Sequence, residues 1–376
     1  MCEEIRHSPV WTLGRRARCC TARRISVGAP RGYPSARFII LKGEMKMEPC
    51  KILVVAGPTA SGKTALGVEL CKLFDGEVVS GDSMQVYRQL SIATAKPTEE
   101  EMQGVPHHLV DCLDITQPFS VAEYVRLAGE AIQDIAGRGK LPVVVGGTGL
   151  YIHSLVDHVQ YAEAPSDPAL RQRLRERALA EGGQALLEEL RLADPETASR
   201  LHPHDVGRIV RALEVVQLTG VTIAEHKALS RREPSPYRPF WIGLDFADRQ
   251  VLYDRINRRV DRMLEDGLVE EAASLLSGES APTAMQAIGC KELAPYLEHR
   301  CTLHEAVENL KRQTRRYAKR QLSWFRREEA MHWYLVDRLS GMENLLQNIK
   351  NDMEINGFLC YDSRVIPGRT SPVEEE

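Results

Sequence analysis

Apolar stretches and amphipathic helices alternate along the first part of the chain. Short apolar stretches predict strands in four places, residues 52–56, 77–80, 107–111 and 141–145. Between the first two, residues 64–74 carry apolar side chains at helical spacing. Ser120 is expected to cap a helix that ends near Arg138. Strand and helix therefore alternate, which predicts a doubly wound α/β core.

From about residue 161 the pattern becomes helical only. Helices are predicted over residues 168–180, 184–192, 195–201 and 205–218, and a polar linker follows at 231–236. The apolar run at 240–244 then predicts a strand that returns to the sheet. The helical block is therefore an insertion rather than a terminal domain.

After the returning strand, the pattern predicts three helices and one further strand, at residues 249–265, 269–276, 304–327 and 333–336. No periodic pattern follows about Asn351, and the chain ends in acids, so we expect a mobile tail. The predicted organisation has five parts. A leader (1–46) precedes the first part of the core (47–160), the helical insertion (161–238), the second part of the core (239–340) and a tail (341–376).

Residues 1–46 differ from the rest because they are rich in arginine, poor in acids and without helical or strand periodicity. A transit peptide and a disordered basic arm both have this composition. Lys42, Gly43 and Glu44 can also be encoded as AAGGAG, a ribosome-binding sequence just upstream of Met45 and Met47. We therefore expect residues 1–46 to be either translated upstream sequence, with the native protein starting at Met45 or Met47, or a disordered segment. Detection of residues 1–44 in the natively expressed protein would contradict the hypothesis of translated upstream sequence.

Composition narrows the class of protein. The 376 residues are 43% hydrophobic and 27% charged, as in a soluble globular protein with one large domain and an accessory one. No stretch approaches the roughly 18 apolar residues of a membrane span. The net charge of −3 argues against a uniformly basic nucleic-acid binder. The nine cysteines form no CxxC pair, so there is no zinc framework, and the pattern is typical of a reducing compartment. We expect a cytoplasmic protein and, separately, a monomer.

The stretch GPTASGKT, at residues 57–64, fits the spacing G-x-x-x-x-G-K-[ST] between a predicted strand and helix. Glycine is needed where backbone N–H groups turn onto phosphate oxygens, and the helix start adds a positive dipole. A chance glycine turn is the alternative, but strand, loop and helix follow in the order that phosphate binding requires. The fold is therefore predicted to be a P-loop NTPase-like parallel sheet with an all-helical insertion. The phosphate-binding residues are Gly57, Pro58, Thr59, Ala60, Ser61, Gly62, Lys63 and Thr64, with Thr64 as the ligand of Mg²⁺.

The second predicted strand ends in polar residues at Asp82, Ser83, Gln85 and Tyr87. In a parallel sheet the carboxyl end of this strand lies beside the phosphate loop, so Asp82 is expected in the same crevice. An aspartate in this position is more often a turn or cap residue. Its polar neighbours favour recognition of a base, and Lys96 is expected to add a cation.

The predicted helix over residues 311–327 carries eight cations and no acid. Charged helix faces are usually only solvated. Here Arg312, Arg316 and Arg320 lie at i, i+4 and i+8, where like charges repel unless a polyanion or internal carboxylates compensate. Aromatic residues are interleaved, which favours contact with RNA or phosphate.

Nine stretches together resemble the bacterial tRNA dimethylallyltransferase family, also called tRNA isopentenyltransferase. They are GPTASGKT (57–64), DSMQVY (82–87), TAKP (94–97), HHLVD (107–111), FSVAEY (119–124), VVGGTGLY (144–151), RIVRALEV (208–215), QAIGCKEL (286–293) and TRRYAKRQLSWFR (314–326). The resemblance covers residues 51–336. Cys290 stands where the family usually has an aromatic residue and Ser323 where threonine is usual, and neither departure removes a charge or a phosphate donor.

The resemblance implies transfer of a dimethylallyl group from dimethylallyl diphosphate to the exocyclic amine of the adenosine on the 3′ side of the tRNA anticodon. The phosphate loop would then hold a diphosphate leaving group. An adenine amine is a weak nucleophile, so a base must take its proton, and Asp82 is our choice. Thr148 resembles the family residue that forms a hydrogen bond near the reacting centre. The resemblance implies an anticodon stem-loop partner, with tRNA-binding residues Asp82, Ser83, Met84, Gln85, Thr148, Arg208, Arg211, Arg316 and Arg320; Arg208 and Arg211 are also candidates for the diphosphate cage.

Two other classes of enzyme remain possible. A small-molecule or nucleotide kinase would share the loop, and an adenylate isopentenyltransferase would share the prenyl chemistry with a free nucleotide. The insertion and the basic helix argue against both, because neither substrate needs a grip on a long polyanion. A non-enzymatic P-loop switch is disfavoured because no nucleobase-specificity motif is present.

Overall fold

The computed structural model describes residues 24–26, 37–41, 44–161, 166–230, 234–278, 281 and 283–359. The chain divides into two compact units, residues 1–48 and 49–376. In the first unit, three short strands form an antiparallel sheet in the order β1-β2-β3, with bounds Arg24–Ser26, Arg37–Leu41 and Glu44–Met47. The sequence predicted no strand there. Strands pair through backbone groups, so they can form where apolar and polar side chains do not alternate, and a prediction from that alternation then misses them. The leader hypothesis lies mostly outside the described residues and stays a prediction.

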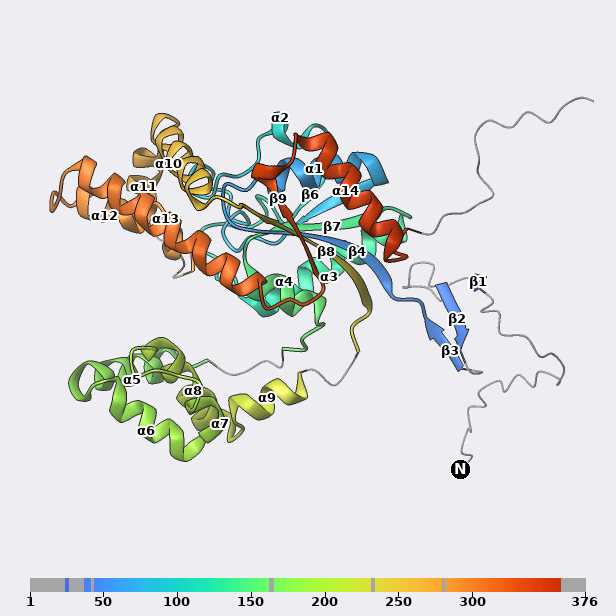
Figure 1. The fold of residues 1–376 in the computed structure, drawn as a ribbon. Coiled ribbons are helices and arrows are strands. Elements are labelled where there is room, and N and C mark those ends of the chain that lie inside the picture. Colours follow the sequence, from blue (N-terminus) through green and yellow to red (C-terminus); the bar gives the residue numbers. More distant parts are fainter. Residues whose placement is uncertain are drawn as a thin grey trace, which may run out of the picture. The chain divides into compact units, whose positions relative to one another are not determined.

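The described strands of the second unit form one sheet of six, in the order β6-β5-β7-β4-β8-β9, and all pairs are parallel (Figure 1). The strands are β4 Cys50–Ala56, β5 Gly76–Ser80, β6 His107–His108, β7 Leu141–Gly146, β8 Tyr237–Asp245 and β9 Met331–Leu335. Because all strands run the same way, the loops after β4, β5 and β7 meet at one edge. The phosphate loop, the segment from Asp82 and the segment from Gly146 all lie there.

Helices cover both faces of this sheet. On one face, helices α1 and α14 pack on apolar side chains of the central strands, including Val55 and Ile242. On the other face, α3, α4 and the helices α10 to α13 enclose a second core around Val54 and Trp241. The bounds are α1 Lys63–Phe74, α2 Glu99–Met102, α3 Val121–Gly137, α4 Gly149–Val156, α10 Arg249–Glu265, α11 Leu268–Ser277, η1 Ala284–Gln286, α12 Cys290–Leu297, α13 Leu303–Phe325, η2 Val336–Arg338 and α14 Met342–Ile355.

The predicted helical insertion is confirmed. It lies between α4 and β8 and consists of α5 Pro168–Glu181, α6 Gly183–Ala193, α7 Pro195–Ala198, α8 Val206–Thr219 and α9 Ile223–Leu229. Its helices enclose a hydrophobic core of their own, which includes Leu174, Leu186 and Ile209. No helix in the described part of the chain is long and apolar enough to cross a membrane.

The strand predicted over residues 107–111 is shorter than expected. Only His107 and His108 pair with β5, because Leu109 and Asp111 have φ values of 61° and 55°. Such left-handed residues cannot continue a strand. The third predicted strand is therefore a two-residue edge strand that leads into a structured turn.

The prediction of a mobile tail from residue 341 is wrong for its described part. Helix α14 buries Leu345, Ile349 and Met353 against the sheet. After the helix, the carbonyl oxygen of Phe358 accepts a hydrogen bond of 2.5 Å from Lys51 Nζ. The apolar positions at i, i+4 and i+8 carry a helical signal that the sequence analysis overlooked. Residues 360–376 lie outside the described part of the chain.

Candidate active site

The phosphate loop has the backbone that its glycines predict. Gly57 has a φ of 152°, and a side chain there would approach the carbonyl oxygen of Leu244 to 2.8 Å. Gly62 has a φ of 93° and immediately precedes α1. Only glycine adopts these conformations without strain. The loop therefore closes tightly between β4 and the N-terminus of α1.

Lys63 lies at this helix N-terminus and points into the loop, where its Nζ donates a hydrogen bond of 2.6 Å to the carbonyl oxygen of Pro58. Burial, together with the nearby charge of Arg259, lowers the pKa of Lys63 to about 7, and the charge of Asp82 opposes this shift. An anion in the loop would restore the ordinary pKa by supplying the missing opposite charge. The free site thus holds an amino group that loses its proton readily, and a bound anion would favour its charged form.

Two hydroxyl groups of the loop have no hydrogen-bond partner among the described residues. The Oγ atom of Ser61 is buried, and buried polar atoms normally have partners. The hydroxyl of Thr64 is only partly buried and lines the pocket, where it could contact a ligand.

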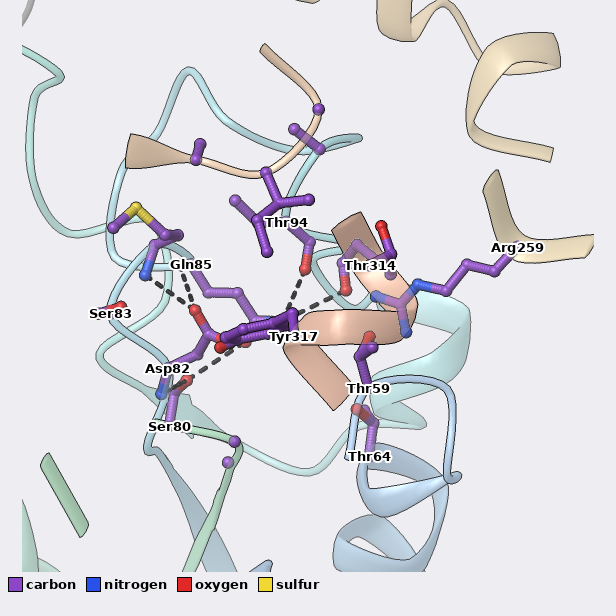
Figure 2. Close-up of a pocket in the computed structure, with 18 of the residues that line it drawn as sticks. Thr59, Thr64, Ser80, Asp82, Ser83, Gln85, Thr94, Arg259, Thr314 and Tyr317 are labelled. Carbon is purple, nitrogen blue, oxygen red and sulfur yellow. Dashed lines mark hydrogen bonds between the residues drawn. The ribbon is translucent and has the colours of Figure 1, made fainter. Parts of the chain in front are cut away.

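A pocket of about 280 Å³ opens from this loop (Figure 2). Its lining includes Lys63, Thr64, Arg259, Asp82 and Tyr317. Apolar side chains from α10, α11, the segment after η1 and α13 also line it, namely Val260, Met263, Leu268, Ile288 and Leu310. One cavity is therefore lined both by cationic and polar groups and by apolar side chains.

Asp82 lies at the carboxyl end of β5, as the sequence predicted, and lines this pocket. Its Oδ1 accepts hydrogen bonds from the backbone N–H groups of Met84 at 2.8 Å and Gln85 at 3.4 Å. Asp82 therefore stabilises the turn after β5, the alternative role that the sequence analysis left open. No hydrogen bond or ion pair to the second carboxylate oxygen occurs in the described residues, so that oxygen can still accept a proton.

Thr148 follows β7 and meets the Asp82 segment through Ser83. Its Oγ1 accepts a hydrogen bond of 3.2 Å from Ser83 N and lies 3.4 Å from Ser83 Oγ. Tyr317 of α13 adds a phenol to this group. Burial raises the pKa of Tyr317, the charge of Asp82 raises it further, and hydrogen bonds with Thr148 and Gln321 oppose the shift. The residues predicted to act near the acceptor thus lie together, with a neutral tyrosine that the sequence analysis did not single out.

Gln85 and Tyr87 do not offer free groups for recognising a base. The Gln85 amide nitrogen donates to the carbonyl oxygens of Thr94 and Ala95 at 3.3 and 3.2 Å. Tyr87 is fully buried, and its hydroxyl bonds to Thr283 Oγ1 at 2.7 Å. Both side chains instead hold segments that wall the pocket.

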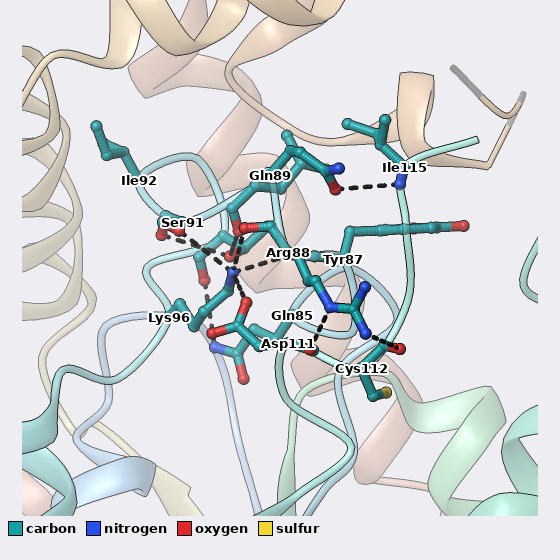
Figure 3. A network of polar contacts seen from close by, with 12 residues as sticks. Gln85, Tyr87, Arg88, Gln89, Ser91, Ile92, Lys96, Asp111, Cys112 and Ile115 are labelled. Atoms are coloured by element: carbon teal, nitrogen blue, oxygen red, sulfur yellow. Dashed lines mark hydrogen bonds and ion pairs between the residues drawn. The ribbon is translucent and has the colours of Figure 1, made fainter. Parts of the chain in front are cut away.

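Lys96 was expected to bring a cation into the crevice, and this expectation is wrong. Its ammonium group donates to the carbonyl oxygens of Tyr87 and Arg88 and to Ser91 Oγ, and it pairs with the carboxylate of Asp111 (Figure 3). The side chain is only 6% exposed and lies outside the set that lines the pocket. These four oxygens lie within hydrogen-bond distance of the ammonium group. They stabilise its charge more strongly than anionic groups at the more distant phosphate site would.

Helix α10 supplies two arginines that the sequence analysis missed. Arg255 Nε donates to the carbonyl oxygen of Ala60 in the phosphate loop at 2.8 Å. Arg259, one turn later, lines the pocket, and burial lowers its pKa. The signal was present, since residues 255 and 259 stand at i and i+4 of a predicted helix, but only the fold shows that this helix passes the loop.

Helix α13 divides its cations between two roles. Lys311 pairs with Asp261 at 2.7 Å, Arg315 donates to Asn257 at 2.7 Å, and Arg326 pairs with Asp245 at 2.8 Å. Arg316 and Arg320 have no carboxylate partner among the described residues. They border a groove of about 680 Å³ whose lining is Arg208, Arg316, Lys319, Arg320, Ser323, Trp324 and Arg327. We call this set the basic groove.

The two arginines predicted from the insertion differ in their surroundings. Arg208 is exposed and borders the basic groove. Arg211 forms an ion pair of 2.6 Å with Glu214, which is fully buried and also pairs with Arg171 at 2.7 Å. Removing one partner of a buried carboxylate destabilises a fold strongly. The contacts of Arg211 are therefore explained by a role in stabilising the insertion. Neither residue lines the pocket that holds the phosphate loop.

This fold and site define the class: a P-loop protein with a parallel sheet, whose phosphate-binding pocket also contains a carboxylate at the end of the neighbouring strand. A family model described as IPP transferase matches residues 85–328. A tRNA dimethylallyltransferase of Thermoanaerobacter sp. (strain X514) is 48% identical over 302 residues, which cover 80% of this chain and 96% of that relative. The chain belongs to the tRNA dimethylallyltransferase family.

Solved structures give the same result. The tRNA isopentenylpyrophosphate transferase of Bacillus halodurans has a TM-score of 0.60 and 43% identity, with 82% of this chain and 98% of that one covered. A eukaryotic dimethylallyltransferase, captured in crystallographic snapshots acting on tRNA, has a TM-score of 0.68 and 29% identity, with 82% and 80% covered. Both confirm the fold class predicted from the sequence.

Proposed function

We propose that this protein transfers the dimethylallyl group of dimethylallyl diphosphate to the exocyclic amine of the adenosine on the 3′ side of the anticodon in tRNA. The products are isopentenyladenosine in tRNA and diphosphate. The observation that carries the proposal is one pocket lined by Lys63, Asp82 and Tyr317, with the basic groove on the same helix as Tyr317. Membership of the family supports the same reaction.

The phosphate loop takes the leaving group. As the bond between the donor's first carbon and its oxygen breaks, negative charge grows on the diphosphate. Lys63, Arg259 and the N-terminus of α1 stabilise that charge without having to reorient. The uncompensated state of Lys63 in the free site supports this role.

Asp82 takes the proton of the acceptor. The adenine amine forms the new bond to carbon, and the amine proton passes to the carboxylate oxygen that has no described partner. Thr148 and Tyr317 orient the base beside it. The hydrogen bonds of Asp82 Oδ1 to two backbone N–H groups support this assignment, because they fix the carboxylate.

The apolar wall takes the five-carbon group. Val260, Leu268 and Leu310 are almost fully buried. Met263 of α10, which stands between Val260 and Leu268 in the sequence, also lines the pocket. These side chains offer no polar partner to water beside the reacting carbon. Exclusion of water protects an activated prenyl donor from hydrolysis.

Mg²⁺ would be held at the phosphate loop through the hydroxyl of Thr64, which lines the pocket and has no hydrogen-bond partner among the described residues. Hydroxyl oxygen is a ligand type that Mg²⁺ accepts. When bound, the ion would neutralise part of the leaving group's charge.

The acceptor is tRNA rather than a free nucleotide. The anticodon stem-loop would lie along the basic groove, and its adenosine must leave the stack to enter a pocket of this size. A kinase or an adenylate prenyltransferase would need no such grip. Since one chain supplies both groove and pocket, we expect a monomer acting in the cytoplasm, where tRNA is found.

The test is transfer of radiolabel from dimethylallyl diphosphate to tRNA and to AMP in parallel reactions. We expect label in tRNA only, with Mg²⁺ required. Label in AMP would favour the adenylate prenyltransferase, and label in neither would exclude both prenyl transfer proposals.

A further inference from the structure

Gln321 of α13 connects the two loops at the reacting end of the pocket. Its Oε1 accepts a hydrogen bond of 2.8 Å from the backbone N–H of Thr59 in the phosphate loop. Its Nε2 donates a hydrogen bond of 3.0 Å to the carbonyl oxygen of Gly147 in the loop after β7. The side chain is only 5% exposed. One buried amide thus joins the donor side of the site to the acceptor side.

The chemistry of the two loops fixes the orientation of this amide. Thr59 presents an N–H group, so only the oxygen of Gln321 can face it, and Gly147 presents a carbonyl, so only the nitrogen can face that. A side chain at residue 147 would lie 2.1 Å from the Gln321 nitrogen. Residue 147 must therefore be glycine for the bridge to form. The bridge also means that the N–H of Thr59 is not available to a phosphate.

The same helix holds the acceptor group and the groove. Tyr317, one turn before Gln321, lines the same pocket as Gln321 and the Asp82 segment. Arg316 and Arg320 border the basic groove, and Arg320 also lines the pocket. One helix therefore contacts the phosphate loop and the loop after β7, and it also forms part of the basic groove.

We propose that Gln321 is a positioning residue that holds the donor loop and the acceptor loop at a fixed separation. This inference rests on the proposed function. In-line attack needs the amine and the donor carbon within about 3 to 3.5 Å, and small misplacements lower the rate steeply. Each loop binds its own substrate through other groups. Gln321 therefore contributes to the rate of transfer more than to either affinity.

The test compares Gln321→Met, which keeps the shape and removes both hydrogen bonds, with Gln313→Met as the matched control. Gln313 lies on the same helix, and among the described residues its amide nitrogen donates a hydrogen bond of 3.4 Å to Asn309 Oδ1 and to no other group. For Gln321→Met we expect kcat to fall about 10- to 100-fold, with dissociation constants for dimethylallyl diphosphate and tRNA within about threefold of wild type. Gln313→Met should retain wild-type kcat. Melting curves show that each variant is folded at the assay temperature.

A second variant, Gly147→Ala, reaches the bridge from the opposite side and covers the case in which Gln321→Met does not fold. Its added methyl group should displace the Gln321 amide and lower kcat to a similar extent. Normal kcat in a folded Gln321→Met protein or in Gly147→Ala would overturn the inference. Weakened affinity for one substrate with normal kcat would also overturn it, since Gln321 would then be a binding residue. If the wild-type protein transfers no prenyl group to tRNA, the proposed function fails first and this inference falls with it.

Discussion

At the scale of single residues, Asp82 carries the most specific prediction. Asp82→Asn keeps an oxygen that can accept the backbone hydrogen bonds of Met84 and Gln85, so the turn should survive. The amide cannot take a proton, and turnover should fall by roughly 10²-fold or more while both substrates still bind. Single-turnover transfer and equilibrium binding on the same protein check this. Near-normal turnover would remove Asp82 from the reaction.

Lys63 leads to a prediction on pH. Its pKa is lowered to about 7 in the free site, so a bound diphosphate must draw in a proton above that pH. Donor affinity should fall as the pH rises from 7 towards about 9, because proton uptake becomes more costly as protons become scarcer. Calorimetric titration in two buffers of different ionisation enthalpy at alkaline pH would detect the uptake.

Lys63→Arg is the control for that measurement. A guanidinium remains charged throughout this range, so the variant should bind the donor without net proton uptake. Wild-type protein that binds equally well at both ends of the range, with no proton taken up, would show that Lys63 is already charged in the free site.

At the scale of elements, α13 separates into cations that pair internally and cations that do not. Arg316→Gln with Arg320→Gln should weaken tRNA binding at low salt. Each lost phosphate contact should flatten the slope of log affinity against log salt by about 0.7 to 0.9. Affinity for dimethylallyl diphosphate should not change in Arg316→Gln alone, because Arg316 borders only the basic groove, whereas Arg320 also lines the pocket. A salt titration of tRNA binding checks this.

Lys311→Gln is the matched control on the same helix. Lys311 pairs with Asp261 and faces α10, so its loss should lower the melting temperature slightly and leave the salt slope as it is. The opposite result, a stability loss in the Arg316 and Arg320 variant with an unchanged slope, would move the RNA contact to another surface.

Helix α14 provides a stability test of the corrected tail. Ile349 is fully buried against the sheet. Ile349→Ala should destabilise the protein by about 2 to 5 kcal/mol, because it removes buried methyl groups and leaves a cavity. Chemical denaturation measures this, and Lys350→Ala, at an exposed neighbour, is the control. No change in Ile349→Ala would mean that the helix is not docked in solution.

The elements also show what the sequence could predict. Strands β4, β5, β7 and β8 and the insertion were predictable, because their apolar patterns and glycine loops are local signals. The partners of Lys96 and the approach of Arg255 and Arg259 to the phosphate loop were not. These depend on which helix and which turn pass the site, and that information comes from the whole fold rather than from spacing.

At the scale of the whole molecule, the sheet brings three separate segments to one edge. The loop from Gly57, the turn from Asp82 and the loop from Gly146 follow three neighbouring strands, β4, β5 and β7. Helix α13, far along the chain, closes the same pocket with Tyr317 and Gln321. Donor and acceptor would therefore react in one cavity, on an adenosine that the basic groove delivers.

Mapping the modified nucleoside tests directly whether the adenosine reacts in this cavity. Two anticodon stem-loop RNAs are incubated with the protein, Mg²⁺ and dimethylallyl diphosphate, one with adenosine and one with guanosine on the 3′ side of the anticodon. Nucleoside mass spectrometry should find one dimethylallyl group on that adenosine and none on the guanosine RNA. Modification of both RNAs, of an adenosine elsewhere in the loop, or of neither RNA would contradict the account.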